Sequence, residues 1–282
     1  MSLAGFVTIT RPTNALVAGL AAVVAYLIAT GTVIPATLLL FVIVALITAA
    51  GNVINDYYDA AIDAINRPDR PIPSGRVTRI AARGFSVMLF LGGILVSLFT
   101  SPLCIAIAIF NSFLLVAYAA KLKSTPFFGN ATVSYLAASM FLFGGALAGT
   151  EGLIHVLPVA MITFFAMLSR ELVKDAEDVK GDAAGGASTL PILIGVKTTT
   201  TLAFIFAILA VIASFIPYAW WGAFYLAGII PVDIIILIAA ARAVSRETPE
   251  GIRESGAAMF LKIGFFASLV VFFLAAVFLT PA

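Results

Sequence analysis

Two segments of the chain carry aspartates at the same spacing. Both read D-x-x-D-x-x-x-D, and their acids are Asp56, Asp59 and Asp63 in the first segment and Asp175, Asp178 and Asp182 in the second. On a helix, positions i, i+3 and i+7 fall within an arc of about 60°, so each triplet would present its carboxylates on one face. Carboxylates this close repel one another unless a cation lies among them. Carboxylate and amide oxygens suit Mg²⁺, which keeps few protein ligands and completes its octahedron with water and phosphate oxygens.

The alternative interpretation is a solvated loop in which the acids balance nearby arginines. One such motif is compatible with that reading. Two copies in register, each following an even-numbered apolar stretch, favour a paired magnesium site instead. A parallel repeat of this kind is a known way to build a site between the halves of a membrane protein.

A stiff cationic segment follows the first motif. Residues 67–76 contain three prolines and three arginines, and Lys121 and Lys123 are expected on the same side of the membrane. Arginine grips phosphate oxygens in a fixed fork. Magnesium and basic side chains at the mouth of an apolar helix bundle predict a substrate with an anionic head and a long apolar tail, of which prenyl pyrophosphates are the obvious class.

The elements that position these residues are membrane spans. Of the 282 residues, 62% are hydrophobic and 11% are charged, whereas a soluble domain has roughly a quarter charged residues. A bilayer core needs about 20 apolar residues per helix. The apolar stretches predict nine spans at 13–31, 34–55, 82–100, 103–120, 129–149, 154–173, 199–217, 221–241 and 257–279.

We therefore expect an all-α integral membrane protein that is one domain over 1–282. Two four-helix pseudo-repeats, spans 1–4 and 5–8, would be followed by a ninth helix, with acidic and basic cytoplasmic loops at about 55–82 and 171–198. The outer surface of the helix bundle would contact membrane lipid. The net charge of +2 gives no reason to expect a nucleic-acid partner.

The basic residues indicate how the bundle is oriented. All 16 Lys and Arg residues fall on one side of the nine predicted spans. The positive-inside rule makes that side cytoplasmic. The N-terminus and the motif-bearing loops would then lie in the cytoplasm of a cell-membrane protein, with the C-terminus outside.

These residues resemble the UbiA-type superfamily of intramembrane prenyltransferases. Residues 55–63 look like its first signature and residues 175–182 like its second, and the resemblance extends over essentially the whole chain. Within the superfamily, residues 55–75 and 170–175, together with Leu122-Lys123, Pro126 and Gly129-Asn130, look most like an archaeal subfamily. The resemblance implies a geranylgeranyl pyrophosphate donor, a geranylgeranylglyceryl phosphate acceptor, and nine helices around a central cavity with cytoplasmic caps.

The segment Ile72-Pro73-Ser74-Gly75 is shared in part with chlorophyll synthase-type members. An aromatic, quinone-precursor or chlorin acceptor is therefore the alternative within the superfamily. Outside it, a divalent-cation transporter would also have many spans, a repeat and acidic clusters. Transport sites usually lie near the midplane on broken helices, whereas these clusters lie at helix ends beside a basic segment. A lipid phosphotransferase would share the metal site but transfer the phosphoryl group.

We assign roles to the motif residues as hypotheses. One Mg²⁺ would be held by Asn55, Asp59 and Asp63, and the other by Asp178 and Asp182. Catalytic roles beside the metals, as nearby ligands or their partners, are predicted for Asp56 and Asp175. Additional pyrophosphate contacts are predicted for Arg67, Lys121 and Lys123. The roles of Arg11 and Arg70 stay open between pyrophosphate contact and positive-inside anchor.

Three further polar residues lie within or beside the predicted spans. Glu171 shares the face of the second aspartate triplet, one turn deeper towards the membrane, and could be the general base or the partner of Arg170 or Lys174. Asn14 opens span 1, where its amide would face the cavity and bind substrate or cap the helix. Asp233 lies well inside span 8 and is not assigned to catalysis.

Overall fold

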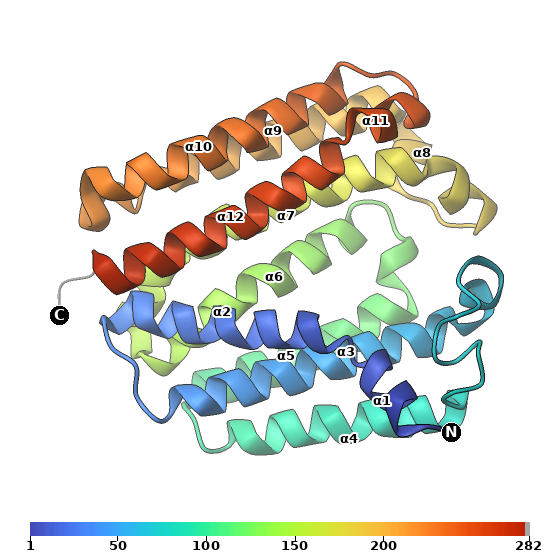
Figure 1. Ribbon diagram of the computed structural model, residues 1–282, viewed down its shortest axis with the longest axis horizontal. Helices are drawn as coiled ribbons and strands as arrows, with labels where there is room; N and C mark the ends of the chain where they lie inside the picture. The colour runs from blue at the N-terminus through green and yellow to red at the C-terminus, as the bar shows by residue number, and fades with distance from the viewer. Residues whose placement is uncertain (280–282) are drawn as a thin grey trace.

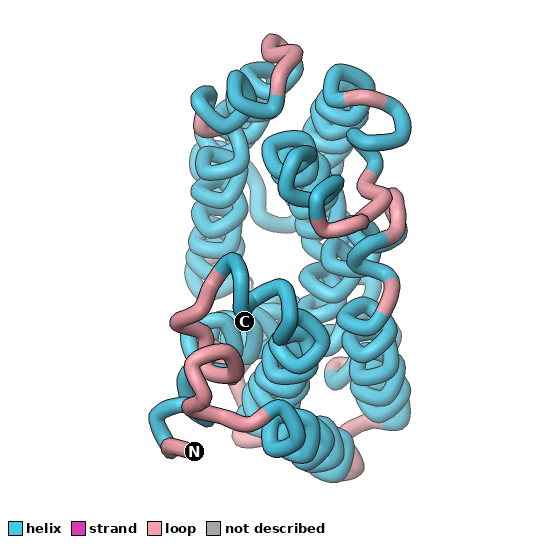
Figure 2. Tube along the Cα trace, turned by 90° about the vertical axis from the view of Figure 1, so that its right-hand side faces the viewer, coloured by secondary structure: helices cyan, strands magenta, loops and turns pink. Residues whose placement is uncertain are grey.

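A computed structural model describes residues 1–279. This part of the chain contains helices, turns and loops but no strand (Figure 2). Nine of its helices are long and apolar enough to cross a membrane. They are α2 (Pro12–Thr30), α3 (Thr37–Asn66), α4 (Arg79–Ser97), α5 (Pro102–Ala120), α6 (Phe128–Leu147), α7 (Gly149–Ala184), α9 (Val196–Ser214), α10 (Tyr218–Val244) and α12 (Ala257–Phe278). The predicted count of nine spans is confirmed.

Local sequence explains where many of these helices begin. Pro12 and Pro102 occupy first-turn positions, where a missing N–H costs nothing. The hydroxyls of Thr78 and Ser101 accept hydrogen bonds from first-turn N–H groups of α4 and α5. Most helix ends lie within about three residues of the predicted limits, the usual error of boundaries predicted from a sequence.

The two motif-bearing helices are longer than predicted, which corrects the expected loop boundaries. Span 2 was predicted to end at residue 55, but α3 continues to Asn66; span 6 was predicted to end at residue 173, but α7 continues to Ala184. The loops therefore begin about one motif later than expected. Hydropathy predicts only where a helix leaves the hydrocarbon layer. The polar turns beyond that point stay helical because they keep their backbone hydrogen bonds and pack against the rest of the protein.

The four short elements are α1 (Leu3–Ile9), a 3₁₀ turn η1 (Leu122–Ser124), α8 (Leu190–Ile194) and α11 (Pro249–Ser255). Helices α1, α8 and α11 gather at the end of the bundle where α3 and α7 finish, on the right in Figure 1. Helix α12 finishes at the opposite end. Both acidic motifs therefore lie at one end of the bundle, on the side expected to be cytoplasmic.

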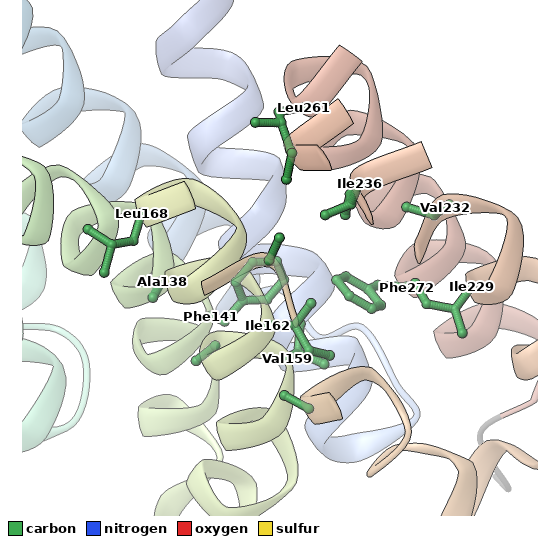
Figure 3. Close-up of a cluster of buried hydrophobic side chains, with 14 of the residues drawn as sticks. Ala138, Phe141, Val159, Ile162, Leu168, Ile229, Val232, Ile236, Leu261 and Phe272 are labelled. Carbon is green, nitrogen blue, oxygen red and sulfur yellow. The ribbon is translucent and has the colours of Figure 1, made fainter. Parts of the chain in front are cut away.

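The helices form a closed bundle in which α12 packs against α2. Helix α2 also packs along α6, so the two halves meet in the middle of the molecule (Figure 1). The largest buried hydrophobic cluster joins α6, α7, α10 and α12, with Phe141, Ile162, Ile229 and Phe272 among its members (Figure 3). The second half of the bundle is thus densely packed, and open space is left elsewhere.

The polar residues Asp233, Ser214 and Tyr225 lie in this packed half. The side chains of Asp233 and Ser214 are hydrogen-bonded at 2.7 Å, and the Tyr225 hydroxyl donates to the Ser214 carbonyl at 2.9 Å. These bonds connect α10 to the end of α9. The intramembrane carboxylate therefore has a structural partner.

Gly144 permits the close approach of α6 to α2. A Cβ built at this position would lie 2.3 Å from the Ala22 carbonyl oxygen and 2.8 Å from the Tyr26 nitrogen, both backbone atoms. We expect Gly144→Ala to destabilise the protein by about 1–3 kcal/mol through overpacking. The thermal midpoint in detergent measures this. Gly84→Ala is the matched control, since nothing lies within 4 Å of a Cβ there; equal midpoints for the two variants would contradict the expectation.

Candidate active site

A cavity of about 800 Å³ lies between α3, α5 and α6, with the end of α7 at its mouth. One end of α3 contributes Asn55, Asp59 and Asp63 to its wall, and the other end contributes Ile43. The distance along α3 from Ile43 to Asp63 is roughly 30 Å at a rise of 1.5 Å per residue. The cavity is therefore long, charged at the end where α3 finishes and apolar at the other, deep end.

The cavity lies to one side of the bundle. Among the described residues, none from α9, α10 or α12 lines it, because α2 and α6 meet through Gly144 in the middle of the bundle. The apolar wall includes Ile43, Val44, Ile47, Ala108, Leu115, Val133, Leu136, Met140 and Phe143. A prenyl chain would fit such a wall.

A second, more polar cavity of about 460 Å³ opens beside the first. The two share Ile62, Asn66, Arg67, Lys123 and Gly181 in their walls. The wall of the second cavity includes Asp178 and Asp182 of the other motif. The two acidic motifs therefore face one continuous space at the end of the bundle where α3 and α7 finish.

The acids of the first motif are each paired with a basic side chain. Arg70 bridges Asp63 at 2.6 Å and Asp56 at 3.3 Å, and Arg11 donates to the same Asp56 oxygen at 2.6 Å. Asp59 accepts from Lys123 and, at 2.9 Å, from Asn55. Since Asp56 and Asp63 are nearly buried, at 4% and 6% exposure, these pairs compensate charges that would otherwise be costly.

The second motif is less compensated. Asp178 pairs with Arg253 of α11 at 3.1 Å, and both side chains are well exposed. Asp175 accepts a hydrogen bond from the Asn130 amide at 2.8 Å. Helix α11 is also connected to α7 by the Lys180–Glu250 pair at 2.6 Å. The connection between α10 and α12, which contains α11, thus contacts the second motif, and no local pattern in the sequence predicts this contact.

The predicted site residues divide into those that line the cavities and those that do not. The predicted metal ligands and two predicted pyrophosphate contacts line one cavity or both: Asn55, Asp59, Asp63, Asp178, Asp182, Arg67 and Lys123. Asp56 and Asp175 lie beside them, outside the lining.

Asn14, Lys121 and Glu171 line neither cavity. The Glu171 carboxylate accepts from Arg170. The side chains of Asn14 and Lys121 are exposed.

Several polar residues without a predicted site role also line the first cavity, among them Asn111, Tyr118 and Lys174. Arg11, whose role was open between pyrophosphate contact and anchor, lines it as well. Arg11 has a left-handed backbone at φ 50°, a costly conformation for a residue with a side chain, and its guanidinium reaches Asp56. Asn111 and Tyr118 lie seven residues apart on one face of α5, a spacing that could have been recognised inside an apolar span. Lys174 enters the cavity wall from α7.

The residues present fit magnesium. Within residues 1–279, no group of three or more His, Cys, Asp or Glu side chains forms a preassembled metal cage. Mg²⁺ is usually held by one or two carboxylates plus substrate phosphates and water. Two aspartates of each motif line the connected cavities. The donor set is all oxygen, which is the chemistry that Mg²⁺ prefers.

Comparison with known proteins identifies the class that this fold and site define. Residues 16–270 match the UbiA prenyltransferase family. The chain belongs to that family, and it is a multi-pass membrane prenyltransferase.

Among its relatives is the digeranylgeranylglyceryl phosphate synthase of Methanoregula boonei. The two sequences are 61% identical over 279 residues, which cover 99% of this chain and 100% of the relative.

Solved structures share the fold. One described as digeranylgeranylglyceryl phosphate synthase in membranes superposes with a TM-score of 0.85 at 35% identity and covers 98% of both chains. A UbiA homolog from Archaeoglobus fulgidus bound to GPP and Mg²⁺ has a TM-score of 0.59 at 16% identity, covering 93% of this chain and 99% of that one. The second likeness extends to the fold alone.

Proposed function

We propose that this protein transfers a geranylgeranyl group from geranylgeranyl pyrophosphate to geranylgeranylglyceryl phosphate, with pyrophosphate as the leaving group. The product would be digeranylgeranylglyceryl phosphate, the diether precursor of archaeal membrane lipid. The observation that carries the proposal is the 61% identity over the full length of a relative with that name. The long cavity with an apolar deep end and a charged mouth supports it.

The donor would lie with its tail along α3, α5 and α6 and its pyrophosphate between the two motifs. Asn55, Asp59 and Asp63 would hold one Mg²⁺, and Asp178 and Asp182 the other. Bound magnesium would neutralise the charge that develops on the leaving pyrophosphate. Arg67 and Lys123 face this space from the shared wall and would contact the same oxygens.

In the reaction the allylic carbon–oxygen bond of the donor breaks and its electron pair leaves with pyrophosphate. The acceptor hydroxyl forms the new carbon–oxygen bond, and its proton is taken up by the departing pyrophosphate. The apolar wall beside the reacting carbon would exclude water, which would otherwise compete with the acceptor. Asp56, held by Arg11 and Arg70, would position the metal-binding face of α3.

The positive-inside pattern supports a cytoplasmic position for this mouth, with the N-terminus inside and the C-terminus outside. Both substrates would then bring their charged heads from the cytoplasmic leaflet. Their tails would enter from membrane lipid.

A transfer assay with purified protein tests the function. The protein in detergent is incubated with Mg²⁺, radiolabelled geranylgeranyl pyrophosphate and one of three acceptors: geranylgeranylglyceryl phosphate, 4-hydroxybenzoate or a naphthoate. We expect label on the glyceryl phosphate and release of pyrophosphate. Label on an aromatic acceptor would instead support the alternative within the superfamily. An absence of transfer from folded protein would contradict the proposal and return attention to cation transport.

The role of Glu171 is tested by Glu171→Gln. A general base contributes about 10²–10⁴-fold to the rate. We expect a loss below about tenfold, because the Glu171 carboxylate is paired with Arg170 and lies outside the cavity lining. Single-turnover rates at saturating acceptor measure the effect. A loss of 100-fold or more would establish Glu171 as the base and require the Arg170 pair to open during turnover.

A further inference from the structure

Five basic side chains line the first cavity, and they fall into two groups. Three of them, Arg11, Arg70 and Lys123, are paired with acids of the first motif. Among the residues that the structure describes, the side chains of the other two, Arg67 and Lys174, make no direct ion pair or hydrogen bond. Lys174 interacts with the charges of Asp175 and Asp182 without contacting them. The cavity therefore has two basic side chains that are free of a direct contact with an acid.

The two unpaired cations occupy different positions. Arg67 follows α3 and lines both cavities, at their shared mouth. Lys174 comes from α7 and lines only the first cavity. Within the described residues, α7 contributes just Lys174 and Gly181 to the first cavity, and a Cβ at Gly181 would meet nothing within 4 Å. Lys174 and Gly181 are seven residues apart and therefore share one face of α7, and Lys174 is exposed.

The reaction requires more than one anion site. The donor brings a pyrophosphate, and the acceptor brings a phosphate monoester of about −1.5 to −2 charge at pH 7. Glycerol has three carbons, so at most one carbon lies between the carbon that bears the phosphate and the carbon that bears the attacking hydroxyl. The acceptor phosphate must therefore lie close to the allylic carbon, inside the first cavity and beside the donor.

We propose that Lys174 binds the phosphate of the acceptor and thereby selects a phosphorylated glycerol lipid over an uncharged acceptor. The inference rests on the proposed function and adds a specificity-determining residue to it. Lysine serves as a point-charge phosphate ligand. Its position on α7, beside Asp175 and one turn before Asp178, sets the acceptor head next to the predicted leaving group. Arg67, at the shared mouth, remains with the pyrophosphate.

The preference for a phosphorylated acceptor has an energetic cause. Binding is weakened when the phosphate has no cation beside it, or when Lys174 has no phosphate beside it. A site built around a charged group strongly rejects an analogue that lacks it. Aromatic acceptors carry no phosphate and would gain nothing from Lys174. This one side chain would thus separate the proposed acceptor class from the alternatives within the superfamily.

The test compares two proteins with two acceptors. Wild type and Lys174→Met are assayed with geranylgeranylglyceryl phosphate and with geranylgeranylglycerol, which differs only by the phosphate. Methionine keeps the length of the side chain and removes the charge. We expect the KM for the phosphorylated acceptor to rise about 10- to 100-fold, as for one lost charge-assisted hydrogen bond. The KM for the donor and the rate with geranylgeranylglycerol should stay close to wild type.

Two control variants separate binding from folding. Lys174→Arg keeps the charge and should restore most of the preference for the phosphorylated acceptor. Lys262→Met removes an exposed lysine of α12 that lines neither cavity, and should behave as wild type. Equilibrium binding of labelled geranylgeranylglyceryl phosphate, without donor or Mg²⁺, gives a readout independent of turnover and should weaken in Lys174→Met alone.

Three results would overturn the inference: an equal loss with both acceptors, a raised KM for the donor, or unchanged binding of the phosphorylated acceptor by Lys174→Met. Failure of the proposed function is a different observation. In that case wild type itself transfers no label to geranylgeranylglyceryl phosphate, while the binding measurement still reports on Lys174.

Discussion

Replacing Asp178 by Asn is expected to lower kcat/KM for prenyl transfer by about 100- to 1,000-fold, the range found when one preorganised electrostatic contact to a developing charge is removed. Asp178 is predicted to hold a metal ion, and amide oxygen carries no charge to offset that of Mg²⁺. Its side chain is 45% exposed, and within residues 1–279 its one ion pair is with the exposed Arg253. Loss of such a surface pair costs little stability, so the variant should remain folded.

Two measurements distinguish the metal role from a general disturbance. Binding of Mn²⁺ in the presence of pyrophosphate should weaken in Asp178→Asn, and the thermal midpoint in detergent should stay near that of wild type. Glu254→Gln is the matched control, because this exposed carboxylate of α11 lines neither cavity. If Asp178→Asn retained most of its activity and its Mn²⁺ binding, Asp178 would have no place in the metal site.

The span count and the helical spacing of the two aspartate motifs were predictable from the sequence. A helix in lipid must satisfy its own backbone hydrogen bonds, so apolar length determines the spans directly. Helical periodicity places Asp59 and Asp63 on one face, and the structure has both on the cavity wall with Asn55. Asp56, the first acid of the same triplet, lies outside the lining and pairs with Arg11 and Arg70. Both features depend on local chemistry that the chain carries within a few turns.

Features that depend on contacts between distant segments were not predictable in the same way. Arg11 and Asp56 are 45 positions apart, and the sequence left Arg11 open between an anchor and a ligand. The position of the cavity depends on how α2 meets α6 at Gly144, a glycine that hydropathy treats like any other residue. The contact between Arg253 and Asp178 joins connections 75 positions apart. None of these long-range contacts produces a periodic pattern in the sequence.

The extensions of α3 and α7 were only partly predictable from the sequence. Their polar turns lowered the hydropathy that was used to set the span limits, although the aspartate spacing itself is helical. The aspartate spacing therefore indicated that both helices continue through the motifs, whereas the span limits set by hydropathy ended them too early. A limit set by where helical spacing of acids ends would have placed both helix ends closer to Asn66 and Ala184.

Removing the charge of Arg70 is expected to have the largest effect on stability. Its guanidinium joins Asp56 and Asp63, whose side chains are 5% and 8% exposed. Asp56 keeps Arg11 in the Arg70→Ala variant, but Asp63 is left without a basic partner. Breaking a buried pair from one side costs about 3–5 kcal/mol, since an uncompensated charge remains. The thermal midpoint in detergent should fall by several degrees.

A double variant separates the unpaired charge from lost packing. Adding Asp63→Asn to Arg70→Ala removes the uncompensated carboxylate and should recover a substantial part of the stability, as a double-mutant cycle would show. Activity should not recover, because Asp63 is a predicted metal ligand. Arg83→Ala, an exposed arginine of α4, should leave the midpoint unchanged. If the double variant were less stable than Arg70→Ala, the arginine would act through packing of its stem, and the pairing of Asp63 would not be the source of the effect.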